Sequence, residues 1–146
     1  GSEYRAPELS CALLYSQLLK VKKIQNLRKR NWNIFKRLID KLNTRKCYLV
    51  KSSQKSTSAF HILALIFRST KLANDFKKIL QSQEVAATFH YVPLHKSKMG
   101  KKFCNYRIPL TEDIYNKVVR LPLYSDMSKG EINKISSLIK SFLIQK

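Results

Sequence analysis

The chain has 146 residues, 44% of them hydrophobic, which is enough apolar material for the core of one ordinary domain. Its 29 lysines and arginines outnumber 9 aspartates and glutamates, so a formal net charge of +20 requires an anionic partner or a well-solvated basic surface. Since no apolar run approaches the roughly 18 to 20 residues of a membrane span and no signal-peptide pattern opens the chain, we expect a soluble, cytoplasmic protein without membrane contact.

The cysteines argue against a metal site. Cys11, Cys47 and Cys104 are an odd number at wide spacing, and the paired C-x-x-C clusters that structural zinc requires are missing. We therefore expect reduced thiols and no bound metal.

Two helices are expected in the first third of the chain. Pro7 suits a first helical position, Glu8 beside it favours the positive end of a helix, and leucines follow at helical spacing. From Val21 to Leu42 apolar residues fall on one side of a helical wheel and most basic residues on the other. The basic residues are Lys22, Lys23, Lys29, Arg30, Lys36, Arg37, Lys41 and Arg45.

This basic face has two interpretations. It could lie along a phosphate backbone as a nucleic-acid-binding module, or it could be the solvated side of an amphipathic helix. Trp32 and Phe35 lie on or beside the apolar stripe and do not interleave with the basic residues as a base-stacking surface would require. The solvated face is therefore the preferred interpretation, and a nucleic-acid partner is the alternative.

The middle of the chain predicts a strand, a helix and a second strand. A polar loop at Lys51–Ser58 precedes Ala59–Phe67, an apolar run that predicts a strand covered on both faces, with His61 as a core histidine. A helix follows Ser69 or Thr70 as N-cap, and Val85–Tyr91 reads as the second strand.

Two further helices complete an α+β arrangement. One starts at Thr111, with acidic residues in its first turn, and is expected to end near Arg120. The other follows Ser128-Lys129-Gly130-Glu131, which has the S-x-x-E form of a capping box, and carries apolar residues at helical spacing. Helices packed against a small sheet are therefore the expected fold class.

Three stretches are more specific than a pattern of hydrophobicity. The opening segment runs G-S-E-Y-R-A-P-E-L-S-C-A over residues 1–12, and Q-L follows at 17–18. Residues 89–95 read F-H-Y-V-P-L-H, with Met99-Gly100 and Phe103 shortly after. Residues 120–124 read R-L-P-L-Y and lead into the capping box.

In their order and spacing these stretches resemble the C-terminal region of the DegT/DnrJ/StrS family of sugar-nucleotide aminotransferases, nearest to the transaminases of dTDP-4-oxo-6-deoxyhexoses. The resemblance implies the small C-terminal domain of a fold-type I aminotransferase that uses pyridoxal phosphate (PLP). It further implies that residues 1–146 form a single domain. Residues 1–45 would be junction helices leading from a missing large domain, and residues 46–146 a small α+β domain.

The resemblance also implies an activity that this chain cannot perform alone. Family members transfer an amino group to a keto-sugar nucleotide in glycan biosynthesis, such as that of lipopolysaccharide O-antigen, and they act as homodimers. The cofactor lysine of their large domain lies in an S-x-H-x-T-K-type motif that is absent here, and Ser69-Thr70-Lys71 lacks its histidine. We therefore expect no catalytic residue in this chain and no PLP held by it alone.

Five residues are candidates for binding by resemblance. His90, Tyr91 and His95 correspond to a loop that contacts the sugar nucleotide. The alternative is that His90 and Tyr91 simply end a strand and that His95 is exposed to solvent. Glu3 and Arg5 correspond to a segment that holds the cofactor phosphate across the dimer. Because a carboxylate at Glu3 would repel phosphate, the segment has a changed geometry, relies on Arg5 for compensating charge, or belongs to an inactive remnant.

Overall fold

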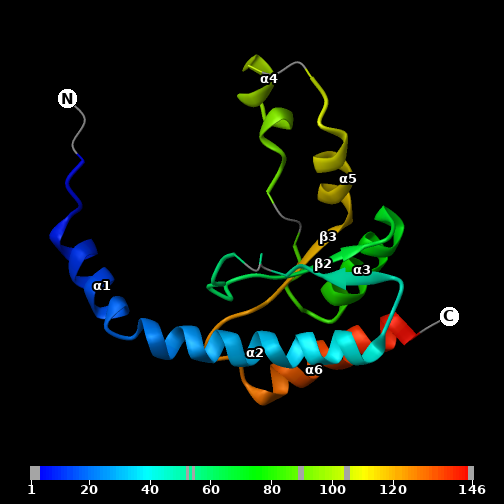
Figure 1. Ribbon diagram of the computed structural model, residues 1–146, viewed down its shortest axis with the longest axis horizontal. Coiled ribbons are helices and arrows are strands. Elements are labelled where there is room, and N and C mark those ends of the chain that lie inside the picture. Colours follow the sequence, from blue (N-terminus) through cyan, green and yellow to red (C-terminus); the bar gives the residue numbers. More distant parts are fainter. Residues whose placement is uncertain (1–3, 52, 54, 89–90, 104–105, 145–146) are drawn as a thin grey trace.

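The computed structural model describes residues 4–51, 53, 55–88, 91–103 and 106–144. Its strands form one antiparallel sheet in the order β1-β2-β3, and helices lie against it (Figure 1). The strands are β1 (Cys47–Leu49), β2 (Leu63–Phe67) and β3 (Val118–Leu121). The helices are α1 (Glu8–Leu18), α2 (Val21–Leu42), α3 (Thr70–Ser82), the short 3-10 turn η1 (Leu94–Lys96), α4 (Gly100–Phe103), α5 (Pro109–Lys117) and α6 (Lys129–Ile144). The expected α+β class is therefore observed.

The core lies between one face of the sheet and three helices. Helix α2 contacts α6 and β1, while α3 contacts the sheet and α6. Phe35 of α2, Leu65 and Phe67 of β2, and Phe76 of α3 are at most 1% exposed. Helix α2 contributes to the same core as the sheet, so residues 1–45 and 46–146 do not have separate cores. The division of the chain into junction helices and a small domain stays a prediction.

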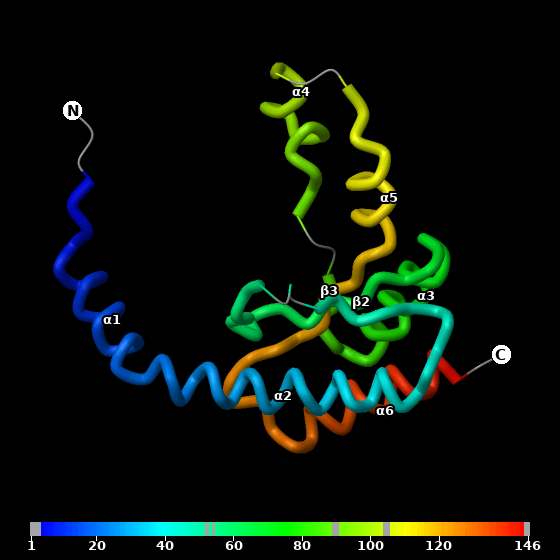
Figure 2. The backbone as a smooth tube through the Cα atoms, viewed as in Figure 1, coloured from blue at the N-terminus to red at the C-terminus, as the bar shows by residue number. Residues whose placement is uncertain are grey.

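Helix α1 lies outside this core. It begins at Glu8, one residue after the expected Pro7, and none of its residues is buried. The tube in Figure 2 runs from α1 through a turn at residues 19–20 into α2, so that α1 projects from the body of the molecule. Nothing in the described chain covers its leucines.

The strand expected at Ala59–Phe67 is shorter than predicted. The Ser58 hydroxyl accepts a hydrogen bond from the backbone N–H of Phe60 at 3.0 Å, and Phe60 has a positive φ of 47°, which a strand cannot contain. Strand β2 therefore starts only at Leu63. The prediction that His61 is a core-strand histidine is wrong, because His61 is exposed and precedes the strand.

The third strand comes from a segment that was predicted to be helical. Helix α5 ends at Lys117 because Val118 adopts an extended conformation (φ −85°, ψ 134°), and Val118–Leu121 pairs with β2. The strand predicted at Val85–Tyr91 is not formed in the described residues, where Thr88 makes one isolated bridge to Arg120. Residues 89 and 90 lie outside the described part of the chain. Strand β1 was not predicted.

The predicted N-termini of α3 and α6 are confirmed. Ser69 is the N-cap of α3, its hydroxyl accepting a hydrogen bond from the N–H of Leu72 at 3.2 Å. At α6, the Ser128 hydroxyl accepts from the Glu131 N–H at 3.1 Å and a Glu131 carboxylate oxygen accepts from the Ser128 N–H at 2.8 Å. This reciprocal pair is the capping box that the sequence predicted.

Candidate functional site

Residues 91–103 and 106–117, here called the arm, stand away from the core and contain η1, α4 and α5 (Figure 1). Pro109 at the start of α5 and Glu112 in its first turn both favour a helix N-terminus. Gly100 permits a tight contact between η1 and α4, because a Cβ there would lie 1.7 Å from the Leu94 carbonyl oxygen. Gly100 of the sequence motif therefore has a steric role.

His95 and Lys96 of η1 both contact Glu112 of α5, and these contacts join the two parts of the arm. The His95 Nε2 lies 3.1 Å from Glu112 Oε1, and the Lys96 Nζ lies 2.7 Å from Glu112 Oε2. Hydrogen bonds from Lys96 and His95 lower the pKa of Glu112 to about 2. Only 8% of the His95 side chain is exposed, so the alternative of a solvent-exposed His95 is wrong.

This contact predicts an acid-dependent loosening of the arm. A carboxyl whose folded pKa lies below its usual 4.5 adds stability above pH 4.5 that is lost as the pH falls toward 2. We expect Glu112→Gln to increase amide hydrogen exchange in η1 and α5 at neutral pH, and this difference from the unaltered chain to vanish toward pH 2.

The control is Asp113→Asn, which removes a neighbouring carboxylate whose ion pair with Lys117 stays within α5. It should leave exchange in η1 unchanged. Equal exchange in Glu112→Gln and the unaltered chain at neutral pH would contradict a linking role for Glu112.

Tyr91 brings two of the sequence motifs together. It is 76% exposed at the base of the arm, and its ring centroid lies 6.0 Å from the guanidinium carbon of Arg120. Arg120 opens the R-L-P-L-Y motif, and its backbone pairs with Thr88. His90 lies outside the described residues. The predicted binding roles of Tyr91 and His95 stay predictions.

The R-L-P-L-Y motif is anchored by a residue that sequence reasoning missed. Asn31 is completely buried, and its Nδ2 donates to the carbonyl oxygens of Tyr124 at 2.8 Å and Ser125 at 3.4 Å. The Tyr124 hydroxyl hydrogen-bonds to Glu131 of the capping box. The sequence did contain a sign that Asn31 is buried, because Asn31 lies four residues from both Leu27 and Phe35 on the apolar side of α2.

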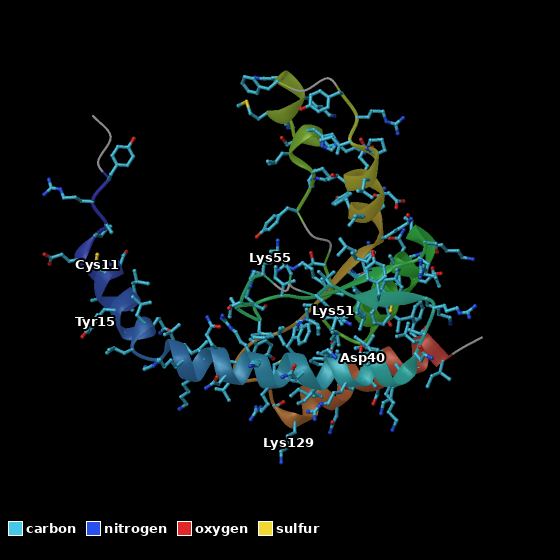
Figure 3. The ribbon with its side chains drawn as sticks, viewed as in Figure 1. Cys11, Tyr15, Asp40, Lys51, Lys55 and Lys129 are labelled. Atoms are coloured by element: carbon cyan, nitrogen blue, oxygen red, sulfur yellow. The ribbon has the colours of Figure 1, made fainter. Side chains whose placement is uncertain are left out.

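A cavity of about 520 Å³ opens between the arm and the face of the sheet that the core helices leave open. Its lining includes Trp32 of α2, Lys51 after β1, His61, and Tyr91 and Tyr115 of the arm. The stick view in Figure 3 labels Lys51 and, on the same loop, Lys55, which does not line the cavity. Of these lining residues, only Tyr91 was a candidate from the sequence.

The opening segment does not join this site in the described structure. Glu3 lies outside the described residues. Arg5 is exposed and precedes α1, which projects away from the sheet and the arm (Figure 1). The predicted cofactor-phosphate role of Glu3 and Arg5 therefore stays a prediction. Among the described residues, no helix is long and apolar enough to cross a membrane, and no group of three potential metal ligands occurs.

The model of the DegT/DnrJ/EryC1/StrS aminotransferase family matches residues 1–140. This chain belongs to that family. The chain is 26% identical over 83 residues to the dTDP-3-amino-3,6-dideoxy-alpha-D-galactopyranose transaminase of Aneurinibacillus thermoaerophilus, covering 56% of this chain and 23% of that enzyme.

Two solved structures have the same fold over almost the whole chain. Helicobacter pylori PseC, an aminotransferase involved in the biosynthesis of pseudoaminic acid, superposes with a TM-score of 0.84 at 18% identity, over 98% of this chain and 39% of PseC. DesV of S. venezuelae, solved in complex with a ketimine intermediate, has a TM-score of 0.87 at 15% identity, over 100% of this chain and 39% of DesV. The chain thus matches only the C-terminal part of sugar aminotransferases.

The family is PLP-dependent, but the described residues that line the cavity do not fit this cofactor. PLP needs a lysine for its Schiff base and a carboxylate for its pyridine nitrogen. Among the described residues that line the cavity, Lys51 is the one lysine and is exposed, and none is a carboxylate. Lys71 lies in the first turn of α3 and does not line the cavity. No catalytic step is therefore assigned to this chain.

Proposed function

We propose that this chain is the small-domain part of a PLP-dependent aminotransferase that acts on a 4-keto-6-deoxy sugar nucleotide. A large domain, N-terminal in the relatives, would supply the cofactor lysine and the phosphate site. This chain would contribute the arm, with His90, Tyr91 and His95 as its proposed substrate-binding residues, and contacts of a homodimer. The product would be an amino sugar for a glycan.

The exposure of α1 is the observation that carries this proposal. Leu9, Leu13 and Leu18 are 54% to 74% exposed, and Leu14 and Tyr15 extend the apolar surface to other sides of the helix. A helix that is apolar all round is normally buried within a larger protein. The family match makes the large domain the natural cover for α1.

The proposal is tested by joining the chain to its large domain. The region encoded directly upstream, expected to carry a lysine motif, would be produced together with this chain and given PLP. We expect the absorbance band of a pyridoxal Schiff base in the complex and not in the chain alone. The complex should also transfer an amino group from glutamate to a dTDP-4-oxo-6-deoxyhexose.

Two results would contradict the proposal. A Schiff-base band that forms on the chain alone and survives dialysis would place a cofactor lysine here. A complex that binds PLP but transfers no amino group would identify the chain as part of an inactive remnant. A nucleic-acid-binding role has less support, because the α2 lysine Lys36 is ion-paired with Asp40 and Trp32 packs against the core.

A further inference from the structure

The outer surface of α2 carries a row of basic side chains that the core does not use. This basic row consists of Lys23, Arg30, Arg37 and Lys41. Its members are seven, seven and four residues apart, close to whole numbers of helical turns, so they follow one line along the helix. All four are exposed, whereas Phe35 and Ile39 of the same helix are buried. At 1.5 Å per residue, the basic row is about 27 Å long.

The charges of the basic row are not neutralised within the described part of the chain. The ion pairs of the described residues involve other cations, and Asp40, the single acidic residue in the sequence of α2, is paired with Lys36. Arg30 and Arg37 each donate a hydrogen bond to an uncharged oxygen of α2. The basic row therefore presents four positive charges to solvent or to a partner.

Helix α6 extends this basic surface. It contacts α2 and lies beside it, while the arm is on the other side of the sheet (Figure 2). Its lysines Lys129, Lys134 and Lys140 are exposed, and Figure 3 shows Lys129 on the side of the molecule away from the arm. The carboxylate of Glu131 in α6 is held by the Tyr124 hydroxyl and the Ser128 N–H. The basic row and these three lysines are here called the basic face.

The composition of the basic face favours lipid headgroups over nucleic acid as the anionic partner. Single-stranded nucleic acids are bound by aromatic side chains on which the bases stack. The aromatic side chains of α2 and α6 are not available for this, because Phe35 and Phe142 are buried and Trp32 packs against the core. An anionic bilayer presents a plane of negative charge, and each basic residue beside it strengthens binding about fivefold. Two adjacent helices with lysines and arginines along both suit such a plane.

We propose that the basic face docks on an anionic lipid bilayer, with α2 and α6 lying along the membrane surface. The attachment is peripheral and electrostatic, and the net charge of +20 adds a long-range attraction. The expectation of no membrane contact drew on the lack of an apolar run long enough to span a membrane, which peripheral docking does not require. The proposal does not depend on amino transfer, because the basic face includes neither α1 nor the arm.

Sedimentation of the chain with lipid vesicles gives a direct test. We expect the chain to bind vesicles of phosphatidylserine and phosphatidylcholine, and not vesicles of phosphatidylcholine alone. Added salt should weaken the binding, because it screens exposed charges. Lys23→Gln combined with Lys41→Gln removes two charges from the basic row and should weaken binding about thirtyfold. Both lysines are exposed, so this variant should unfold at the same denaturant concentration as the unaltered chain.

The matched control is Lys101→Gln combined with Lys102→Gln, which removes two exposed lysines from α4 in the arm. It should bind vesicles like the unaltered chain. Equal losses in the two double variants would overturn the proposal, because they would indicate a general attraction set by net charge. No binding to the phosphatidylserine vesicles, or equal binding to both kinds of vesicle, would also overturn it. Tighter binding to a thymidine oligonucleotide than to these vesicles at equal phosphate concentration would do the same and would identify nucleic acid as the partner.

Discussion

Replacing Phe76 by alanine is expected to lower the free energy of unfolding by about 4 kcal/mol, the typical cost of removing a buried phenylalanine ring. Phe76 is 0% exposed, and its ring centroid lies 5.3 Å from that of Phe67 and 5.0 Å from that of Phe142. The substitution would remove the ring that joins α3 to both β2 and α6. Chemical denaturation of the chain would measure the loss.

Two further variants make this prediction specific. Phe76→Leu keeps much of the apolar volume and should cost less than about 2 kcal/mol, so it remains measurable if the alanine variant does not fold. Phe103→Ala removes a ring that is 82% exposed in α4 and should change stability by no more than about 0.5 kcal/mol. Similar losses at Phe76 and Phe103 would contradict the assignment of the core.

The helices could be predicted because their signals are local. The apolar stripe of α2 runs from Val21 to Leu42, which are also the bounds observed. Ser69 and Ser128 mark helix starts through hydrogen bonds to residues three positions away. Side chains at this spacing are neighbours on a helix whatever the rest of the chain does, so these elements need no knowledge of the tertiary fold.

The strands depend on partners far away in the chain. The V-V-R-L segment of β3 follows α5 without a glycine or proline to mark the change, and it becomes a strand through pairing with β2. Strand β1 has three residues, too few to show alternation. In the Val85–Thr88 segment Val85 and Ala87 are buried and alternate with exposed residues, but backbone pairing is limited to Thr88.

The candidate site was only partly visible in the sequence for the same reason. Family resemblance pointed to Tyr91 and His95 because they lie in one continuous motif. Trp32, Lys51 and Tyr115 are separated by many residues and meet only when α2, the loop after β1 and α5 are placed around the sheet. No local spacing could have associated them. His61 was assigned to the core because the turn at Ser58 was not recognised within an apolar run.

Helix α1 is expected to govern assembly without contributing to the stability of the isolated chain. None of its residues is buried, so Leu13→Ser combined with Leu14→Ser should leave the free energy of unfolding nearly unchanged. Burying a leucine contributes about 1.5 to 3 kcal/mol, and about 1.4 kcal/mol changes an affinity tenfold. If the large domain covers both leucines, the double variant should therefore bind it about a hundredfold more weakly.

Titration calorimetry of the chain with the large-domain polypeptide would measure this affinity. Gln17→Ser is the matched control, because it places serine at an exposed polar position of the same helix and should bind like the unaltered chain. An unchanged affinity in the double variant would remove α1 from the interface, and a large loss of stability in the isolated chain would mean that α1 already packs on this domain. Phe76 and the leucines of α1 therefore have different roles in the proposal. Phe76 stabilises this domain, whereas the leucines of α1 are exposed and would be covered by the large domain.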